Sequence, residues 1–495
     1  MAHEDRKDFN AMLRKDNGMP KIQIITDQAA IEKYGGSRMF FAPPAAYDAV
    51  MKTIPPGKVT TVGRIRSLFA EQNQADFTDP MTAGIFISIV AWASFQRGQD
   101  ETPYWRTLKA DGELNPKYPG GIEAQREKLE AEGTDVIDLG IGAPDLPTPD
   151  FIVDRLTKEA QLPENHRYPI YSGISEFKEA VAHFYKKHYD VELDPQTEVL
   201  ALIGSKEGIA HLMQAVLNPN DTVLVPDPGY PVYSTGVHLA GGRPVPLPLD
   251  PTNGFVPMYD KLSASDKEKA RLMLLNYPGN PTAATVTLDT FEEAIAFAKA
   301  HHILLAHDAA YDLITFSGYK APSVMQVPGA RDYAVELGSL SKSFSMTGWR
   351  IGYMVGNKAT INALATLKSN LDSGQFIPIQ KAGATALTSD LDSVKKYSHI
   401  YEQRMEALYN GLRSMGFGVE KPKGTIFVWV KVPDGYTSAA FASRLLEKAG
   451  VIVTPGNAFG SRGEGYFRIA LSVSRERLEE ALERLRNLSG EDGDG

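Results

Sequence analysis

Short apolar segments alternate with longer amphipathic segments along the chain beyond about residue 135. Each apolar segment is rich in Val, Ile, Leu or Ala and is followed by Gly, Pro, Asn, Asp or Ser, which is typical of buried parallel strands that end in a turn. The pattern predicts an α/β fold with a mostly parallel sheet covered on both faces by helices. The six segments are VLALIG (199–204), TVLVPDP (222–228), RLMLLNYP (271–278), ILLAHDAAY (303–311), YAVELGSLSK (333–342) and RIGYMVG (350–356).

Beyond about residue 389 the pattern changes to helices separated by TIFVWVKV, VIVTPG and YFRIALS. A last amphipathic helix is marked by apolar residues at helical spacing, from Leu478 to Leu485. This order predicts a smaller α+β domain, completed by the segment just after Gly133. The predicted organisation is a mobile tail (1–24), an N-terminal domain (25–133), a small domain (134–160 and 386–489), a large domain (161–385) and a final tail (490–495).

Composition excludes several classes of protein. The chain has 495 residues, too many for one hydrophobic core, and its net charge of −9 argues against a protein built mainly to hold nucleic acid. It has no cysteine, which removes disulfides, thiolate nucleophiles and cysteine-ligated metals. The charged start MAHEDRKDFN lacks a signal-peptide core, and the longest apolar run, 83–95, is shorter than the roughly 20 residues of a membrane helix. We predict a cytoplasmic enzyme with no metal centre and no membrane segment.

Polar residues follow the predicted strands, where open α/β sheets place their ligands. Ser205 and Lys206 open a helix after the first strand, and free N–H groups at such a start suit a phosphate, although a plain helix cap has the same pattern. Tyr230 after the second strand is either a flat face over a ring or a loop aromatic packed on the core. Asn280 lies in the proline-rich turn NYPGNPTAA, where it is an aimed amide donor.

A carboxylate and a lysine end two further strands. Asp308 closes an apolar strand, where a charge is costly unless a structural arginine or a cationic ring nitrogen pairs with it, and Tyr311 follows three residues later. In SLSKSFSMTGWRIGY, Ser339 and Lys342 end a strand and Arg350 begins the next. Cations near an amine lower its pKa and make it a usable nucleophile, and an arginine fork can grip a phosphate.

These residues together describe one ligand, pyridoxal 5′-phosphate (PLP). Residues 134–488 resemble the fold-type I PLP-dependent aminotransferases, in the motifs NYPGNPT, DAAY, SLSKSFSMTGWRIGY and YFRIALS. The resemblance implies three catalytic residues: Lys342 forms the Schiff base and shuttles the proton, Asp308 keeps the pyridine nitrogen protonated, and Tyr230 covers the ring. The implied PLP-binding residues are Ser205, Lys206, Tyr230, Asn280, Asp308, Tyr311, Ser339, Lys342, Arg350 and Tyr168.

The resemblance also implies substrates and a partner. Arg468 would hold the α-carboxylate of an amino-acid or 2-oxo-acid substrate, with Asn280 and the backbone of Gly142 beside it. Tyr168 matches a tyrosine that reaches the phosphate of the neighbouring subunit, and Asn370 would also come from that subunit. A homodimer with shared active sites is therefore expected.

Three stretches, DVIDLGIGAPDLPTP, IGSKEGIAHL and LKSNLDSGQFIPIQ, look most like LL-diaminopimelate aminotransferases. In that family Lys206 also reaches towards substrate, and the amino group passes between LL-diaminopimelate and 2-oxoglutarate on the route to lysine. Ala143 departs from the pattern, because an acidic residue is expected there. Alanine, aspartate or another amino acid as donor stays open, as does a PLP lyase acting at the β-carbon, which would share Lys342 and Asp308.

Residues 22–133 resemble a different family, the alkylguanine-DNA alkyltransferase-like proteins with a winged-helix core, in IPPGKVTTVGRIRSLFA and in the stretch from PYWR to EAEG. The repair chemistry of that family needs a Pro-Cys-His-Arg motif, and here Tyr104 and Trp105 stand at the Cys and His positions. The domain is therefore predicted to be catalytically dead. Its acidic and basic residues nearly balance, which weighs against DNA binding. A PLP-sensing DNA-binding regulator remains the alternative from another functional class.

Overall fold

The computed structural model describes residues 7–15, 17–28, 31, 34–98, 101–110, 112–133 and 135–491, with side chains through 488. The chain forms two compact units. The larger unit comprises 142–434 and 456–479, and the smaller comprises 1–141, 435–455 and 480–495. These units group the chain by its contacts and leave the domain boundaries at 133, 160 and 385 as predictions.

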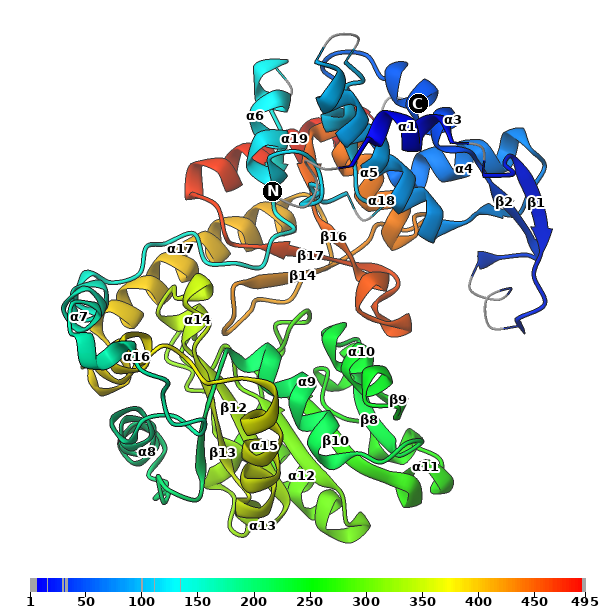
Figure 1. Ribbon diagram of the computed structural model, residues 1–495. Helices are drawn as coiled ribbons and strands as arrows, with labels where there is room; N and C mark the ends of the chain where they lie inside the picture. The colour runs from blue at the N-terminus through cyan, green and yellow to red at the C-terminus, as the bar shows by residue number, and fades with distance from the viewer. Residues whose placement is uncertain are drawn as a thin grey trace. The chain divides into compact units, whose positions relative to one another are not determined.

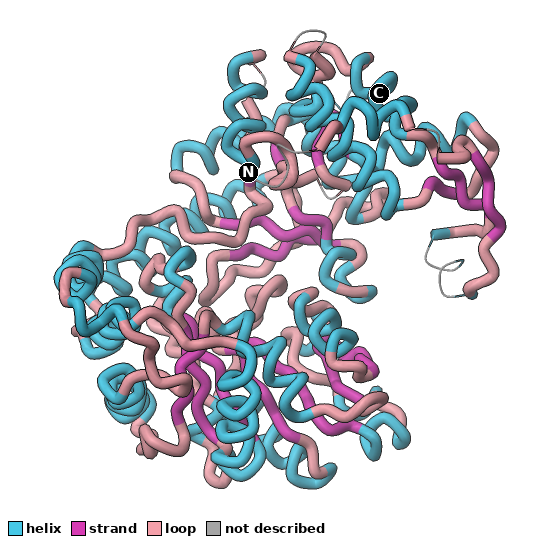
Figure 2. The backbone as a smooth tube through the Cα atoms, viewed as in Figure 1, coloured by secondary structure: helices cyan, strands magenta, loops and turns pink. Residues whose placement is uncertain are grey.

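A seven-stranded sheet forms the centre of the larger unit (Figures 1 and 2). Its strand order is β7-β13-β12-β11-β10-β8-β9, and every neighbouring pair is parallel except the two that involve β13. The predicted mostly parallel sheet is confirmed. The strands are β7 (Val199–Leu202), β8 (Thr222–Asp227), β9 (Arg243–Pro248), β10 (Ala270–Asn276), β11 (Leu304–Asp308), β12 (Ala334–Ser339) and β13 (Gly352–Gly356).

All six segments that were predicted as strands form strands of this sheet. Sequence reasoning missed β9, whose sequence RPVPLP contains three prolines. Proline lacks the N–H that a central strand must donate, so its strands are confined to sheet edges. The position of β9 at the end of the strand order agrees with that rule.

Helices cover both faces of the sheet, as alternation along the strands shows. In β10, Leu272 and Leu274 belong to one buried cluster, whereas Met273 and Leu275 belong to another. Successive residues of a strand point to opposite faces, so each cluster is the core on one side. The longer helices of this unit are α7 (Asp150–Ala160), α8 (Ser175–Tyr189), α9 (Ser205–Val216), α10 (Val232–Leu239), α12 (Leu288–His301), α15 (Lys358–Leu371), α16 (Ile377–Thr388) and α17 (Asp392–Ser414).

The parallel register brings strand ends together at one edge of the sheet. Asp308, the last residue of β11, lies beside Asn276, the last residue of β10. On its other side it pairs with Leu337 of β12, two residues before Ser339. Polar residues from three strands therefore meet at the same edge.

An antiparallel pair of strands in the larger unit carries a second group of polar and aromatic side chains. β14 (Phe427–Lys431) pairs with β17 (Tyr466–Ala470), with Trp429 opposite Arg468. Residues opposite each other share a face, so Arg468 lies on the face that also carries Phe427 and Trp429. Arg468 is 7% exposed.

The smaller unit has its own core, which includes residues from both ends of its sequence. Tyr47, Phe69 and Tyr104 pack in one buried cluster with Leu446 and Ile452. Strand β6 (Ile137–Asp138) pairs in parallel with β15 (Val451–Ile452). Residues 435–455 are therefore part of the same core as the N-terminal segment. The elements of the N-terminal segment are α1 (Phe9–Arg14), β1 (Lys21–Ile24), β2 (Arg38–Phe41), α3 (Pro44–Lys52), β3 (Thr60–Thr61), α4 (Val62–Gln72), β4 (Phe77–Thr78), α5 (Pro80–Arg97), β5 (Thr107–Leu108) and α6 (Gly121–Ala131).

The tail predicted over residues 1–24 contains ordered structure. Helix α1 begins after Asp8, whose side chain accepts a hydrogen bond from the N–H of Ala11, and it buries Phe9 and Leu13. The Phe9 ring stacks on Trp92 of α5, with centroids 5.7 Å apart. Two apolar side chains four residues apart were too short a pattern to predict this helix. Residues 1–6 and 492–495 of the two predicted tails lie outside the described residues.

No helix in the described part of the chain combines the length and the apolar character that crossing a membrane requires.

The shared core of the smaller unit generates a prediction. Leu446 is 2% exposed, so Leu446→Ala leaves a cavity and lowers the free energy of unfolding by about 2–5 kcal/mol. Thermal unfolding followed by circular dichroism measures the change. The control is Leu239→Ala, because Leu239 is 72% exposed and its truncation removes little buried surface. Equal midpoints for the two variants would contradict a shared core.

Candidate active site

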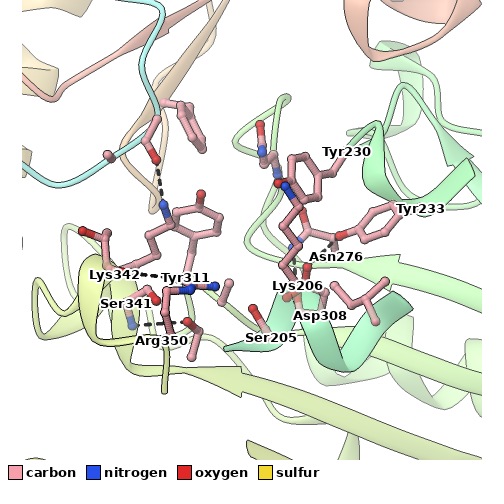
Figure 3. Close-up of a pocket in the computed structure, with 18 of the residues that line it drawn as sticks. Ser205, Lys206, Tyr230, Tyr233, Asn276, Asp308, Tyr311, Ser341, Lys342 and Arg350 are labelled. Atoms are coloured by element: carbon pink, nitrogen blue, oxygen red, sulfur yellow. Dashed lines mark hydrogen bonds between the residues drawn. The ribbon is translucent and has the colours of Figure 1, made fainter. Parts of the chain in front are cut away.

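A cavity of about 360 Å³ opens where the strand ends of the larger unit meet (Figure 3). Its walls combine hydroxyls, amides, cations, one carboxylate and several aromatic rings. The lining residues are Gly142, Ala143, Ser205, Lys206, Ile209, Tyr230, Tyr233, Asn276, Asn280, Asp308, Ala310, Tyr311, Ser339, Ser341, Lys342, Thr347, Arg350, Phe427 and Arg468.

Asp308 places a buried carboxyl group in the wall of this cavity. Asp308 is only 6% exposed, and its Oδ2 accepts a hydrogen bond of 2.8 Å from the Tyr233 hydroxyl. Oδ1 is buried and has no hydrogen-bond partner among the described residues. Burial raises the pKa of this carboxyl group, and the hydrogen bond from Tyr233 opposes that effect. A buried carboxylate oxygen without a partner fits a ligand that brings a cationic N–H.

Two asparagines fix the edge of the cavity next to Asp308. Asn276 donates from Nδ2 to the backbone carbonyl of Asp308 at 2.7 Å. Its Oδ1 accepts from the backbone N–H of Asn280, also at 2.7 Å. The turn that carries Asn280 is thereby tied to the end of β11.

An anion cradle lies on another side of the cavity. Helix α9 begins at Ser205, and its first N–H groups favour an anion. Arg350 approaches this helix start closely, because a Cβ added to Gly204 would overlap its guanidinium. Gly204 also has φ +81°, a conformation that favours glycine. Ser339 lies beside the cradle, and its Oγ accepts from the N–H of Ser341 at 3.2 Å.

Aromatic side chains line the remaining walls. Tyr230 meets Tyr233 edge to face, with ring centroids 5.7 Å apart. Tyr311 is 5% exposed and meets Phe427 at 5.5 Å. Burial raises the pKa of both Tyr230 and Tyr311, so both stay protonated and able to donate a hydrogen bond at neutral pH.

Lys342 lies in the short helix α14 (Leu340–Ser343) directly after β12. Its Nζ donates to the carbonyl of Gly142 at 2.7 Å. Burial lowers its pKa to about 8, with further lowering by Arg468 and Arg350 and an opposing effect of Asp308. The amine is thus unprotonated in an appreciable fraction of molecules near neutral pH, which a nucleophile or general base requires.

Arg468 is held between two aromatic rings. Its Cζ lies 4.2 Å from the centroid of Phe427 and 4.9 Å from that of Phe459. Its Nη1 donates to Oδ1 of Asn280 at 2.8 Å. Gly142 lies close by, because a Cβ at that position would overlap the Phe427 ring. A guanidinium fixed in this way presents a rigid site for a carboxylate.

The cavity contains eleven of the residues that the sequence pointed to and does not contain two. Tyr168 is 86% exposed and lies outside it. Asn370 is exposed on α15, where its Nδ2 donates to the Thr366 carbonyl at 2.9 Å. Both were expected to act on a neighbouring subunit, and that role stays a prediction. The eleven are Gly142, Ser205, Lys206, Tyr230, Asn280, Asp308, Tyr311, Ser339, Lys342, Arg350 and Arg468.

Sequence reasoning assigned no role in the site to Tyr233 or Asn276, the two residues that hydrogen-bond to Asp308. Tyr230 lies in the turn before α10 and Tyr233 lies in its first turn, and their rings meet edge to face. Asn276 is the last residue of β10, at the same edge as Asp308. Both signals are visible in the sequence, but they gain meaning only once the strands are aligned.

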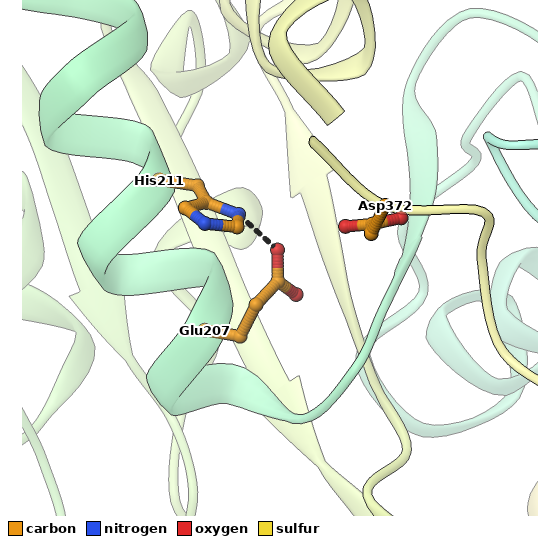
Figure 4. A group of neighbouring side chains, drawn as sticks. All are labelled: Glu207, His211 and Asp372. Atoms are coloured by element: carbon orange, nitrogen blue, oxygen red, sulfur yellow. Dashed lines mark hydrogen bonds and ion pairs between the residues drawn. The ribbon is translucent and has the colours of Figure 1, made fainter. Parts of the chain in front are cut away.

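A second polar cluster, formed by Glu207, His211 and Asp372, has the composition of a metal site (Figure 4). The ammonium group of Lys368 lies between its carboxylates, 2.9 Å from Glu207 and 2.8 Å from Asp372. This buried cation pairs with both carboxylates. The cluster is therefore an ion-pair network that braces the start of α9.

Comparisons with known proteins agree with this site. A family model described as aminotransferase class I and II matches residues 134–485. The LL-diaminopimelate aminotransferase of Moorella thermoacetica is 49% identical over 76% of this chain and 97% of its own length. The protein of the same name from Aquifex aeolicus is 49% identical over 74% of this chain and 94% of its own.

Solved structures are similar as well. Substrate-bound BacF from Bacillus subtilis is 40% identical, with a TM-score of 0.70 over 72% of this chain and 91% of that one. An aminotransferase from Staphylococcus aureus is 38% identical, with a TM-score of 0.70 over 72% of this chain and 94% of that one.

The lowered pKa of Lys342 predicts a distinct reactivity. Because only the unprotonated amine reacts, labelling of Lys342 by an amine-specific reagent should rise with pH, pass its midpoint near pH 8 and then level off. Peptide mass spectrometry of protein freed of cofactor measures this. Lys395 is the internal control, since its hydrogen bond to Asp392 raises its pKa and its labelling should still be rising at pH 10. Parallel curves for the two lysines would contradict the prediction.

Proposed function

Because the chain belongs to the class I and II aminotransferase family and is a PLP-dependent transferase, we propose that it moves an amino group between LL-diaminopimelate and 2-oxoglutarate. The relatives that are 46–49% identical over about three quarters of this chain are named LL-diaminopimelate aminotransferases. The observation that carries the reaction class is the unpaired, buried Oδ1 of Asp308 in the same cavity as Lys342.

Different residues of the cavity bind different parts of PLP. Ser205, Lys206, Ser339 and Arg350 bind the phosphate, where the start of α9 adds its N–H groups. Asn280 and Tyr311 would donate to the phenolic oxygen, and Tyr230 would cover the ring. Asp308 would keep a proton on the pyridine nitrogen through its unpartnered Oδ1. The bound cofactor supplies an electron-accepting ring and an aldehyde carbon.

Lys342 and Arg468 act on the substrate. Arg468 binds the α-carboxylate and is oriented by Asn280 and by the rings of Phe427 and Phe459. The Nζ of Lys342 would move the proton from the α-carbon of the amino donor to the former aldehyde carbon of PLP. It would move a proton in the opposite direction when the 2-oxo acid is aminated. Its pKa of about 8 suits both roles, since general acid–base catalysis is most effective near the working pH.

The exposed side chains of Tyr168, Ile170 and Tyr171 support a homodimer. They form one short segment of large apolar residues at the surface of the larger unit, and such patches mark association sites. In the dimer Tyr168 and Asn370 reach the cavity of the partner subunit.

For the N-terminal domain, residues 25–133, we propose an alkyltransferase-like winged-helix fold that has lost its repair chemistry. The residue at the position of the alkyl-accepting cysteine, Tyr104, is 1% exposed and packs against Tyr118 with ring centroids 5.4 Å apart. Trp105, at the histidine position, is 8% exposed. Both side chains are buried in the hydrophobic core of the smaller unit.

A half-reaction tests the proposed donor. The protein with bound PLP is mixed separately with LL-diaminopimelate, glutamate, alanine and aspartate, without a 2-oxo acid, and visible absorbance follows conversion to the pyridoxamine form. LL-diaminopimelate and glutamate should convert it at least about 10-fold faster than the other two. Conversion by alanine or aspartate alone would replace the proposed substrate. No conversion by any donor, together with salt-sensitive binding to duplex DNA, would favour the PLP-sensing regulator.

Asp308→Asn tests the ring-nitrogen assignment. The amide cannot stabilise a protonated pyridine nitrogen, so kcat should fall at least about 100-fold. Asp266→Asn is the control, because Asp266 is a partly exposed acid that pairs with Arg243 outside the cavity. A kcat for Asp308→Asn within threefold of the unmodified protein would refute the assignment.

A further inference from the structure

Asp227 holds a second buried carboxylate next to the active site, and the proposed reaction gives it no role. It is the last residue of β8, three residues before Tyr230, and is 7% exposed. Its Oδ2 accepts from the hydroxyl of Ser461 at 2.7 Å, and its Oδ1 accepts from the backbone N–H of Arg462 at 3.0 Å. Both donors come from one loop far along the chain.

That loop, residues 456–463, is shaped to receive the carboxylate. Gly460 has φ +124°, and a Cβ at this position would overlap Oδ1 of Asp227. Any other residue would be strained and would also displace the carboxylate. A third hydrogen bond, from the N–H of Gly229 to the carbonyl of Phe459 at 2.8 Å, joins the same loop to the same turn.

The interaction is a hydrogen-bonded clamp and not a salt bridge. No Lys, Arg or His nitrogen forms an ion pair with Asp227 within the described residues. The guanidinium of Arg462 turns instead to Asp250, at 3.5 Å. Only neutral groups donate hydrogen bonds to the buried carboxylate of Asp227, so the strength of these bonds depends on how well the donors are aligned. The hydrogen bonds therefore fix the position of the loop closely.

The loop carries Phe459, one of the two rings that enclose Arg468. The Phe459 ring is 4.9 Å from the Cζ of Arg468 and meets Trp429 edge to face at 6.0 Å. A shift of the loop therefore moves one wall of the Arg468 site. The opposite wall, Phe427, belongs to β14.

We propose that Asp227 is a positioning residue for carboxylate recognition. It clamps the 456–463 loop to the turn that carries Tyr230, and through Phe459 it fixes the guanidinium of Arg468 relative to the cofactor site. This inference rests on the proposed role of Arg468 in binding the substrate carboxylate. It predicts that loss of the clamp weakens carboxylate binding while the cofactor site stays intact.

Asp227→Ala separates these effects. In the protein loaded with PLP, the KM for glutamate and the dissociation constant for the unreactive dicarboxylate glutarate should rise about tenfold, the effect of losing a hydrogen bond to a charged group. The value of kcat should change less than about threefold, and the affinity for PLP should not change. Asp227→Asn retains an acceptor for Arg462 and a polar contact for Ser461, so it should restore most of the affinity.

Asp221→Ala is the matched control, because Asp221 precedes the other end of β8 and its carboxylate accepts from Asn218, outside the cavity. Hydrogen–deuterium exchange gives a readout that needs no turnover. The amide of Arg462 should exchange at least about tenfold faster in Asp227→Ala and at the original rate in Asp221→Ala.

The outcomes are distinct. Unchanged exchange at Arg462, or unchanged glutarate binding, in Asp227→Ala would overturn the clamp. An equal loss of PLP affinity would also overturn it, because Asp227 would then support the whole site. If the unmodified protein converts no amino donor, the proposed function fails, whereas exchange and glutarate binding still decide the clamp.

Discussion

The burial of one carboxylate, that of Asp308, constrains the rest of the active site. It lies at the end of a central strand, where water cannot solvate it, and the hydroxyl of Tyr233 satisfies only one of its oxygens. Burial alone would push this group towards its neutral form. A ligand with a cationic ring nitrogen would pair with the carboxylate and offset the free-energy cost of burying it. The site therefore favours such a ligand. The asparagine beside it and the parallel register keep the oxygen pointed into the cavity.

The cations of the cavity are arranged around that charge. Arg350 lies by the helix start that suits a phosphate, and Arg468 lies between two rings that suit a carboxylate. Lys342 is influenced by both arginines, and its burial and their charge lower its pKa to about 8. The two arginines that we propose as ligand-binding groups thus also help to lower the pKa of the amine, after burial, which has the largest effect.

The N-terminal segment is joined to the aminotransferase sequence by more than a linker. Leu446 and Ile452, which lie within the span of the family model, pack in the core of the smaller unit with Tyr47 and Phe69. Strand β6 continues this core through its pairing with β15. The segment therefore completes the fold around residues 435–455, and removal of residues 1–133 would expose that part of the core.

The sequence by itself determined the class of the fold and most of the chemistry. Apolar runs that end in polar residues identified six strands, because burial on both faces of a sheet leaves a local pattern. The succession of Asp308, Lys342, Arg350 and their neighbours along the chain identified PLP as the cofactor, because each part of PLP requires a different side chain.

Only the tertiary structure decided which groups meet. It aligned Asn276 with Asp308, turned β13 antiparallel and brought Ser461 to Asp227 across 234 positions of the chain. It also showed the edge strand β9, whose prolines do not fit the usual strand pattern, and helix α1 in the segment predicted to be a tail. These features depend on partners distant in sequence, and no local pattern records the alignment of two strands or the distance between two loops.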